Sequence, residues 1–395
     1  TRDEKSNKPQ STSLTGFIDQ AAKNQSLMLS SPGLYIHFPW CIKKCPYCDF
    51  NSHPIRGAAP QKEYFKAVAK DLAHQQIAFG LKRYKSVFFG GGTPSLASPS
   101  YIEKVLTATK LDESAEVTLE LNPGALEFNN LSELRSAGVN RISMGAQSFD
   151  DQHLNTLGRI HNSREILSAF ESLRKTGFTN INVDLMWGLP NQTVTEAIRD
   201  LKQAIALNPE HISWYQLTIE PKTEFYINRP KLPRESTLGQ IEEEGLHLLS
   251  DHRYQRYEIS AFAKDSFECH HNLNYWNFGD YLGVGAGAHG KLTFPNRVTR
   301  TQKPSQPRIY QNNPSETSII NIMQKDLILE FMMNALRLVE GADWSSFERN
   351  TGLHFSDVES TWSKLSNLGL VNPNKCQTTP FGYRNLDSVL ERFCF

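Results

Sequence analysis

The chain has 395 residues, of which 39% are hydrophobic, and its 42 Lys and Arg residues balance its 42 Asp and Glu residues. This length accommodates one large α/β domain and one small domain. The even charge gives no sign of the basic surface that is typical of non-specific nucleic-acid binding. No apolar run approaches the roughly 20 residues that span a bilayer. We therefore expect a neutral, cytoplasmic globular protein with no nucleic-acid partner.

The first segment, residues 1–32, is polar and lacks the apolar core of a signal peptide. We interpret it as a flexible lead-in, and the start at Thr1 leaves a removed upstream segment open. Three of the six cysteines are crowded into eight residues of a long chain. This distribution favours a reducing compartment over the disulfide framework of a small secreted protein.

From residue 33 onward, short apolar runs alternate with amphipathic helical patterns. Six runs predict strands: Leu34–Phe38, Ser86–Phe89, Val117–Leu121, Val139–Met144, Ile181–Met186 and His211–Thr218. Helix starts are marked by capping boxes at Asn162 with Glu165 and at Thr193 with Glu196. A strand–helix alternation of this kind predicts an α/β fold with a parallel sheet, in a core domain over residues 33–292.

Right-handed crossovers bring the carboxyl ends of parallel strands to one edge, so the loops that follow the strands should face one site. Beside the cysteine segment, these loops are Gly90–Pro94, Asn122–Gly124, Gly145–Gln147 and Trp187–Pro190. Each loop alone is a weak signal, because polar and glycine residues are ordinary at strand ends. Their expected convergence makes them candidates for one ligand site.

Cys41, Cys45 and Cys48 follow the first strand with the spacing Cys-x3-Cys-x2-Cys. Three thiolates in one loop can ligate three irons of a four-iron, four-sulfide (4Fe-4S) cluster. The fourth iron is then open to the amine and carboxylate of a small molecule. Zinc or plain structural cysteines are the alternatives, but the spacing fits no common zinc pattern.

Residues 293–318 are rich in Pro, Gln, Asn and Ser and are expected to form a linker. A second, mainly helical domain should follow over residues 319–395. Helices near Gln324–Val339 and Asp357–Leu368 and a β-ribbon near Cys376–Asn385 would give it a winged-helix-like order. Residues 321–395 hold seven Lys and Arg against nine Asp and Glu, which argues against DNA binding by this domain.

The cysteine spacing, with the aromatic Tyr47 before the last cysteine, resembles the signature of the radical S-adenosylmethionine superfamily. The resemblance implies a partial (β/α)6 barrel similar to a TIM barrel. It also implies a 4Fe-4S cluster whose unique iron binds the methionyl amine and carboxylate of S-adenosylmethionine, and reductive cleavage to a 5′-deoxyadenosyl radical.

Further motifs are similar to the anaerobic coproporphyrinogen III oxidase branch of that superfamily, among them Gly90–Ser95, Glu120–Pro123, Gly145–Ser148 and Asp184–Pro190. By this resemblance residues 319–395 would be a HemN-C-like domain. Residues that would contact a first S-adenosylmethionine are Tyr35, Gly91 and Glu120. Residues that match contacts to a second molecule are Tyr47, Gly92, Thr93, Gln147, Arg159 and Asp184. The side-chain types suit these roles, because glycines allow close approach and Arg159 can pair with a carboxylate.

Two features separate this chain from the oxidase. Phe50 stands where the oxidase has an additional cysteine, and only a short polar segment precedes the first strand. Relatives that lack that cysteine form the heme chaperone family HemW, whose His-Asn-x-x-Tyr-Trp motif this chain matches at His271–Trp276. By resemblance His271 would ligate heme iron, with Tyr275 and Trp276 against the porphyrin. A hydrogen-bonded core corner is the alternative, and Cys269, His270 and His289 are lesser candidates.

The sequence thus predicts a heme chaperone that carries a 4Fe-4S cluster and S-adenosylmethionine, binds heme and passes it to acceptor hemoproteins, with membrane respiratory enzymes as candidate acceptors. A homodimer is a candidate assembly, and no catalytic residue is assigned. The alternative function is that of an oxygen-independent coproporphyrinogen III oxidase. A radical enzyme acting on a substrate other than a tetrapyrrole is a third hypothesis.

Overall fold

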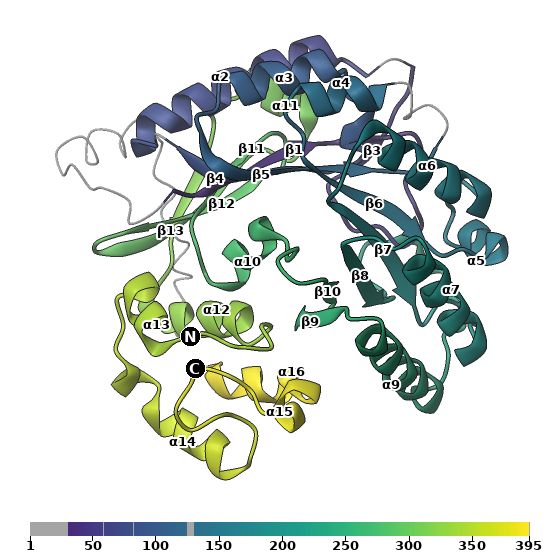
Figure 1. Cartoon of the computed structure of the whole chain (residues 1–395). Helices are drawn as coiled ribbons and strands as arrows, with labels where there is room; N and C mark the ends of the chain where they lie inside the picture. Colours follow the sequence, from purple (N-terminus) through teal and green to yellow (C-terminus); the bar gives the residue numbers. More distant parts are fainter. Residues whose placement is uncertain (1–30, 58, 82, 125–129, 395) are drawn as a thin grey trace, which may run out of the picture.

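A curved twelve-stranded sheet forms the centre of the molecule, with helices over its convex face and a smaller helical domain against its concave face (Figure 1). The computed structural model describes residues 31–57, 59–81, 83–124 and 130–394. Nearly all of the expected lead-in over residues 1–32 lies outside these ranges.

The six predicted parallel strands are all present and are neighbours in chain order. They are β1 (Gly33–Phe38), β4 (Tyr84–Gly91), β5 (Leu111–Leu121), β6 (Arg141–Gln147), β7 (Ile181–Trp187) and β8 (His211–Gln216). A further strand, β11 (Tyr281–Val284), pairs parallel with the other edge of β1. The predicted partial barrel is therefore confirmed, with one additional parallel strand.

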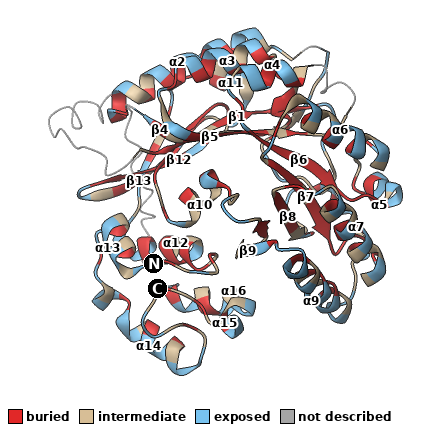
Figure 2. Cartoon of the chain, viewed as in Figure 1, coloured by how far each residue is buried: buried red, intermediate tan, exposed pale blue. Residues whose placement is uncertain are grey.

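The connecting helices cover the convex face of this sheet (Figure 1). They are α2 (Gln61–Phe79), α3 (Pro99–Thr107), α4 (Leu131–Ser136), α5 (Asp151–Thr156), α6 (Ser163–Thr176) and α7 (Val194–Ala206), and a short 3-10 helix, η1 (Pro94–Leu96), lies between β4 and α3. Both predicted capping boxes form, at Asn162 with Glu165 and at Thr193 with Glu196. Figure 2 shows the strands buried and the outer helix faces exposed.

Alternation along the strands explains where the polar residues lie. In β1, Leu34, Ile36 and Phe38 belong to the main apolar core, whereas the intervening Tyr35 and His37 hydrogen-bond to each other. Successive residues of a strand point to opposite faces. The sequence therefore directs apolar side chains toward the outer helices and polar ones toward the concave face, where a ligand site can form.

The expected linker over residues 293–318 is wrong, because these residues complete the sheet. They contribute to β12 (His289–Phe294) and form β13 (Arg297–Gln302) and α11 (Pro307–Asn312), ending at β14 (Ser318–Asn321). Lys303 is 1% exposed and pairs with the buried Asp71 at 2.7 Å. Tyr310 donates to the same carboxylate at 2.9 Å. The polar composition that indicated a linker thus belongs partly to buried, paired groups.

The opposite edge of the sheet carries the short antiparallel strands β9 (Gln255–Glu258) and β10 (Ala261–Ala263). Helices α8 (Glu224–Ile227) and α9 (Glu235–Asp251) precede them. A separate two-stranded sheet joins β2 (Trp40–Cys41) to β3 (His53–Pro54) and frames the cysteine loop. Helix α10 (His270–Trp276) lies on the concave side, between the sheet and the C-terminal domain (Figure 1).

The C-terminal domain is helical and has its own apolar cluster, which includes Phe331, Phe347 and Trp362. Its elements are α12 (Gln324–Ala335), α13 (Trp344–Thr351), η3 (Phe355–Asp357), α14 (Glu359–Asn367), α15 (Pro380–Arg384), α16 (Leu386–Leu390) and η4 (Glu391–Phe393). The ribbon expected near Cys376–Asn385 is reduced to isolated antiparallel bridges, Ala342 with Cys376 and Val371 with Thr378, and does not reach Asn385. Pro380 opens a short helix there, and the Thr379 hydroxyl accepts from the Gly382 N–H at its start. Within the described ranges, every helix is too short or too polar to cross a membrane.

Candidate functional site

A cavity of about 530 Å³ lies on the concave side of the sheet, where the loops after the parallel strands meet. Its volume is in the range of small-molecule sites. Eleven predicted site residues line it: Cys41, Cys45, Tyr47, Cys48, Gly91, Gly92, Thr93, Glu120, Gln147, Arg159 and Asp184. Tyr35, His271, Tyr275 and Trp276 are outside its lining. The convergence expected from the sequence therefore holds for the cysteine loop and the strand ends.

The cysteine loop supplies three thiols to this cavity. Cys41 ends β2 and is buried, whereas Cys45 and Cys48 are partly exposed and share a turn in which the Cys48 N–H donates to the Cys45 carbonyl at 3.1 Å. Burial raises the pKa of Cys41 to about 11 and also raises that of Cys48. Iron binding would offset this effect, because a coordinated thiol loses its proton.

The donor set fits a cluster better than a single ion. Among the residues that the structure describes, no three His, Cys, Asp or Glu side chains are close enough to hold one metal ion. A 4Fe-4S cluster makes a different demand, since each cysteine ligates a separate iron. Three thiols on one loop beside an open cavity satisfy that demand and leave space for a ligand on the fourth iron.

Two glycines bring the backbone of the second strand close to the cysteine loop. Gly91 has φ of +117°, in the region that favours glycine. A Cβ atom at Gly92 would lie 2.3 Å from the carbonyl oxygen of Trp40, so a larger residue does not fit. The next N–H, of Thr93, donates to that carbonyl at 2.8 Å. The glycines thus set the distance between the loop and the cavity wall.

Two carboxyl groups, Glu120 and Asp184, face the cavity from nearby strands. Burial, and then the charge of Asp184, raise the pKa of Glu120 to about 8, although an N–H from Gly91 opposes this at 3.0 Å. Burial also raises the pKa of Asp184, opposed by hydrogen bonds from Asn182 at 2.7 Å and Ser143 at 3.1 Å. Both groups can accept hydrogen bonds from ligand hydroxyls or an ammonium.

Arg159 joins the cysteine loop to the carboxyl end of β6. Its guanidinium donates to the Gly145 carbonyl at 2.9 Å, to Cys45 Sγ at 3.7 Å and to the Asn122 side-chain oxygen. Gln147 ends the same strand with φ of +69°. Its side-chain oxygen accepts from the Tyr215 hydroxyl at 2.7 Å. This end of the cavity can therefore orient a polar ligand beside the thiols.

Tyr35 lies behind this wall. Its hydroxyl is 3.0 Å from His37 Nδ1, and His37 Nε2 is 2.8 Å from the Asn51 carbonyl. A carbonyl only accepts, so His37 carries its proton on Nε2 and accepts from Tyr35. Burial lowers the pKa of His37 to about 4, which keeps the ring neutral. Tyr35 thus positions the residues that follow the cysteine loop.

The residues predicted to contact heme lie together on α10, but in a packed interior. His271 is 2% exposed, its Nδ1 is 2.9 Å from the Ser86 hydroxyl, and its ring stacks on Phe88 at 5.1 Å. Its Nε2 is buried and makes no hydrogen bond within the described chain. Tyr275 meets the His271 ring edge-on at 5.1 Å, and the Arg337 guanidinium covers Trp276 at 4.3 Å. This motif therefore joins the sheet to the C-terminal domain.

The three lesser heme candidates differ in their burial. Cys269 is fully buried and donates to Glu116 at 3.4 Å, whereas His270 and His289 are exposed. From the His-Asn-x-x-Tyr-Trp motif, Asn272 alone among the described lining residues reaches the cavity.

Sequence reasoning missed several lining residues, namely Arg141, Ser143, Asn182, Ser213 and Tyr215. All lie at alternate positions of their strands. Arg141 and Ser143 are in β6 with Gln147, and Asn182 is in β7 with Asp184. Ser213, which pairs with Asp184, and Tyr215 are in β8. The two-residue period of the strands was the signal that would have identified them.

Comparisons with known proteins agree with this geometry. Residues 35–204 match the Radical SAM superfamily and residues 322–375 match the HemN C-terminal domain. The heme chaperone HemW of Haemophilus influenzae is 46% identical, over 91% of this chain and 97% of that protein. HemW of Escherichia coli is 43% identical over the same shares.

A solved structure, coproporphyrinogen III oxidase (HemN) from Escherichia coli, has a TM-score of 0.79 and 23% identity over 96% of this chain and 93% of that one. At this identity the likeness shows the fold. The resemblance inferred from the cysteine spacing and the His271–Trp276 motif is confirmed by the two HemW relatives. The chain belongs to the HemW family of the Radical SAM superfamily.

Proposed function

We propose that this protein is a heme chaperone, which binds heme and transfers it to acceptor hemoproteins while carrying a 4Fe-4S cluster and S-adenosylmethionine. The observation that carries the proposal is the likeness, over 91% of the chain, to relatives named heme chaperone HemW. The cysteine loop supports it, because Phe50, which lines the cavity and is 59% exposed, stands at the position where the oxidase has a further cysteine.

In this proposal, cluster and cofactor occupy the cavity. Cys41, Cys45 and Cys48 hold the cluster, and the amine and carboxylate of S-adenosylmethionine bind its open iron. Gly91, Gly92 and Thr93 bring backbone and hydroxyl groups to the ligand, and Glu120 and Asp184 accept its hydrogen bonds. Tyr47, Gln147 and Arg159 complete the polar wall, with Tyr35 behind it. The residues would have these roles when the cavity holds the cluster and S-adenosylmethionine.

Heme binds through α10 in this proposal. Neutral imidazole is the form that ligates iron, and burial lowers the pKa of His271 to about 4, so the ring is neutral at physiological pH. Its Nε2, which has no hydrogen-bond partner among the described residues, is the atom available to heme iron. Because the ring is 2% exposed, ligation requires α10 to move, with Tyr275 and Trp276 then lying against the porphyrin.

The proposed partners are heme and acceptor hemoproteins, including membrane respiratory enzymes, and the proposed assembly is a homodimer. A cytoplasmic location is part of the proposal, because within the described residues no disulfide joins any of the cysteines at 41, 45, 48, 269, 376 and 394.

One pair of assays tests the proposal against oxidase activity, which the likeness to the HemN fold makes the second candidate. Anaerobically reconstituted protein is titrated with heme and followed by its Soret band. The same preparation is incubated with S-adenosylmethionine, a reductant and coproporphyrinogen III. We expect saturable heme uptake and no protoporphyrinogen IX. Conversion of the porphyrinogen without heme uptake would reject the chaperone function.

A further inference from the structure

The cavity extends well beyond the cysteine loop along the concave face of the sheet. Arg141, Ser143, Gly145 and Gln147 occupy alternate positions of β6 and all line it. Six residues of strand cover about 20 Å. Gln147 lies at the carboxyl end beside the thiols, so Arg141 marks the opposite, inner end.

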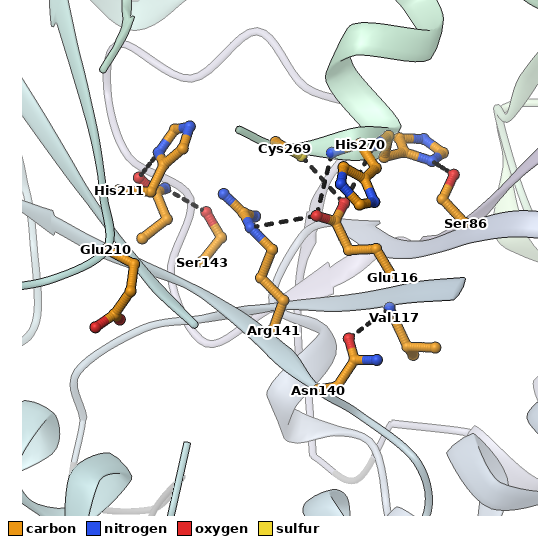
Figure 3. Close-up of polar contacts among 12 residues, drawn as sticks. Ser86, Glu116, Val117, Asn140, Arg141, Ser143, Glu210, His211, Cys269 and His270 are labelled. Atoms are coloured by element: carbon orange, nitrogen blue, oxygen red, sulfur yellow. Dashed lines mark hydrogen bonds and ion pairs between the residues drawn. The ribbon is translucent and has the colours of Figure 1, made fainter. Parts of the chain in front are cut away.

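Arg141 is buried there with unused hydrogen-bonding capacity. Its side chain is 2% exposed, and its nearest ionic partner is Glu116, with Nε and Oε2 3.8 Å apart. This separation is an ion pair without a hydrogen bond, and Nε has no hydrogen-bond partner among the described residues. In Figure 3 the guanidinium stands in the space between His211 and Glu116, and its terminal nitrogens carry no dashed line. A buried donor without a partner is costly, and the remaining donors of a guanidinium that lines a cavity are satisfied there by water or by a ligand.

Glu116 does not supply the missing bonds, because its carboxylate is turned toward the donors of α10 and stays 3.8 Å from Arg141 Nε. Its oxygens accept the backbone N–H groups of His270 and His271, each at 3.1 Å, and the Cys269 thiol at 3.4 Å (Figure 3). Burial opposes ionisation of Glu116, but the charge of Arg141 and the N–H groups of His271 and His270 outweigh it and lower the pKa, so Glu116 is ionised. Glu116 therefore balances the charge of Arg141 while leaving the terminal nitrogens available.

The other neighbours of the guanidinium are also paired. His211 bonds to the Asn182 side chain at 2.7 Å and to the Tyr257 hydroxyl at 2.8 Å. Asp184 accepts from Asn182 and Ser143. Burial raises the pKa of Glu120 to about 8 and raises that of Asp184, which reduces the negative charge that an incoming anion meets.

We propose that Arg141 binds a carboxylate group of the molecule that fills the inner end of the cavity. A guanidinium presents parallel N–H donors that match the two oxygens of a carboxylate. The carboxylate belongs to a heme propionate or to the methionyl group of an S-adenosylmethionine molecule. A methionyl carboxylate on the cluster would lie at the thiol end of the cavity, so the Arg141 site is separate from cluster ligation. The heme source rests on the heme uptake of the proposed function, and the other source rests on its S-adenosylmethionine binding.

Paired ligands that differ in the carboxylate test this site. Anaerobic titrations compare heme with heme dimethyl ester, and S-adenosylmethionine with decarboxylated S-adenosylmethionine, in the wild type, Arg141→Gln and Arg141→Lys. We expect Arg141→Gln to weaken binding of one carboxylate ligand on the order of tenfold while the matching analogue without a free carboxylate is unaffected. Arg141→Lys should give a smaller loss of affinity, because lysine keeps the positive charge but lacks the parallel N–H donors of the guanidinium.

If the substitution weakens binding of heme alone, the site binds a propionate. If it weakens binding of S-adenosylmethionine alone, the site binds the methionyl carboxylate. Equal weakening of acid and analogue, or no change in either pair, overturns the proposal. Because Arg141→Gln leaves Glu116 unpaired, the double variant E116Q/R141Q is compared with Glu116→Gln in the same titrations. Should the wild type take up no heme, the proposed function fails, and the S-adenosylmethionine pair alone still decides the role of Arg141.

Discussion

The backbone N–H of Gly91 donates to Glu120 Oε2 at 3.0 Å, which joins the ends of β4 and β5 at the mouth of the cavity. This single hydrogen bond does not offset the burial of the carboxyl group, whose pKa remains raised to about 8. Glu120 therefore carries a proton at neutral pH in the absence of ligand.

The raised pKa of Glu120 predicts a pH-dependent stability. Between about 4.5 and about 8 the folded state retains the proton and the unfolded state has lost it. The free energy of unfolding should therefore fall as pH rises through this window, by at most roughly 1.4 kcal/mol per pH unit from this group, and then level off. Urea unfolding of the ligand-free protein and of Glu120→Gln measures the effect. Parallel pH profiles for the two proteins would contradict the prediction.

Gly92 is predicted to tolerate no side chain. Gly92→Ala would place Cβ 2.3 Å from the Trp40 carbonyl, next to the start of the cysteine loop. Because the contact is with backbone, we expect a loss of about 1–3 kcal/mol in the free energy of unfolding and lower cluster content. Gly124→Ala is the matched control, since a Cβ there meets no atom of the described residues within 4 Å. Similar stability of the two variants would show that the strand can shift without cost.

The cluster assignment predicts the effect of losing any one thiol. Replacing Cys41, Cys45 or Cys48 with Ala should remove the brown colour and the iron–sulfur absorbance at about 400 nm from anaerobic preparations. Cys394→Ala, at an exposed cysteine in the C-terminal domain, should leave both unchanged. Iron and sulfide analysis provides the measurement. Full retention of both in all three loop variants would defeat the assignment.

His271→Ala should weaken heme uptake and leave the cluster intact. The substitution also removes a buried ring that stacks on Phe88 and bonds to Ser86, so we expect a stability loss of about 2–4 kcal/mol. His270→Ala is the control, because His270 is the exposed neighbour on the same helix. A Soret titration measures heme uptake, and thermal unfolding measures stability. An unchanged titration would return His271 to a purely structural role.

Much of the fold followed from periodicity and spacing. The six parallel strands, both capping boxes and the meeting of loops at one edge were predictable, because each depends on a local pattern and on the fixed hand of the crossovers. Likewise the three thiols are close together in sequence, so their presence in one loop could be predicted without knowing any long-range contact.

The errors came from interactions between distant parts of the chain. Lys303 looks like a linker residue until Asp71, far back in sequence, pairs with it in the interior. His271 has the chemistry of a ligand, but Ser86 and Phe88 from β4 enclose it. Arg141 was missed because its burial against Glu116 depends on β5, β6 and α10 coming together. Polar groups that fold inward cannot be told from surface groups by composition.

The parallel pairing of β11 with β1 also affects how the chain folds during its synthesis. The outer edge of β1 has unpaired backbone groups until Tyr281–Val284 have left the ribosome. During synthesis the half-built sheet therefore exposes an open edge beside the cysteine loop, where pairing with another chain competes with folding. The parallel part of the sheet is therefore complete only after the late strand β11 has been synthesised.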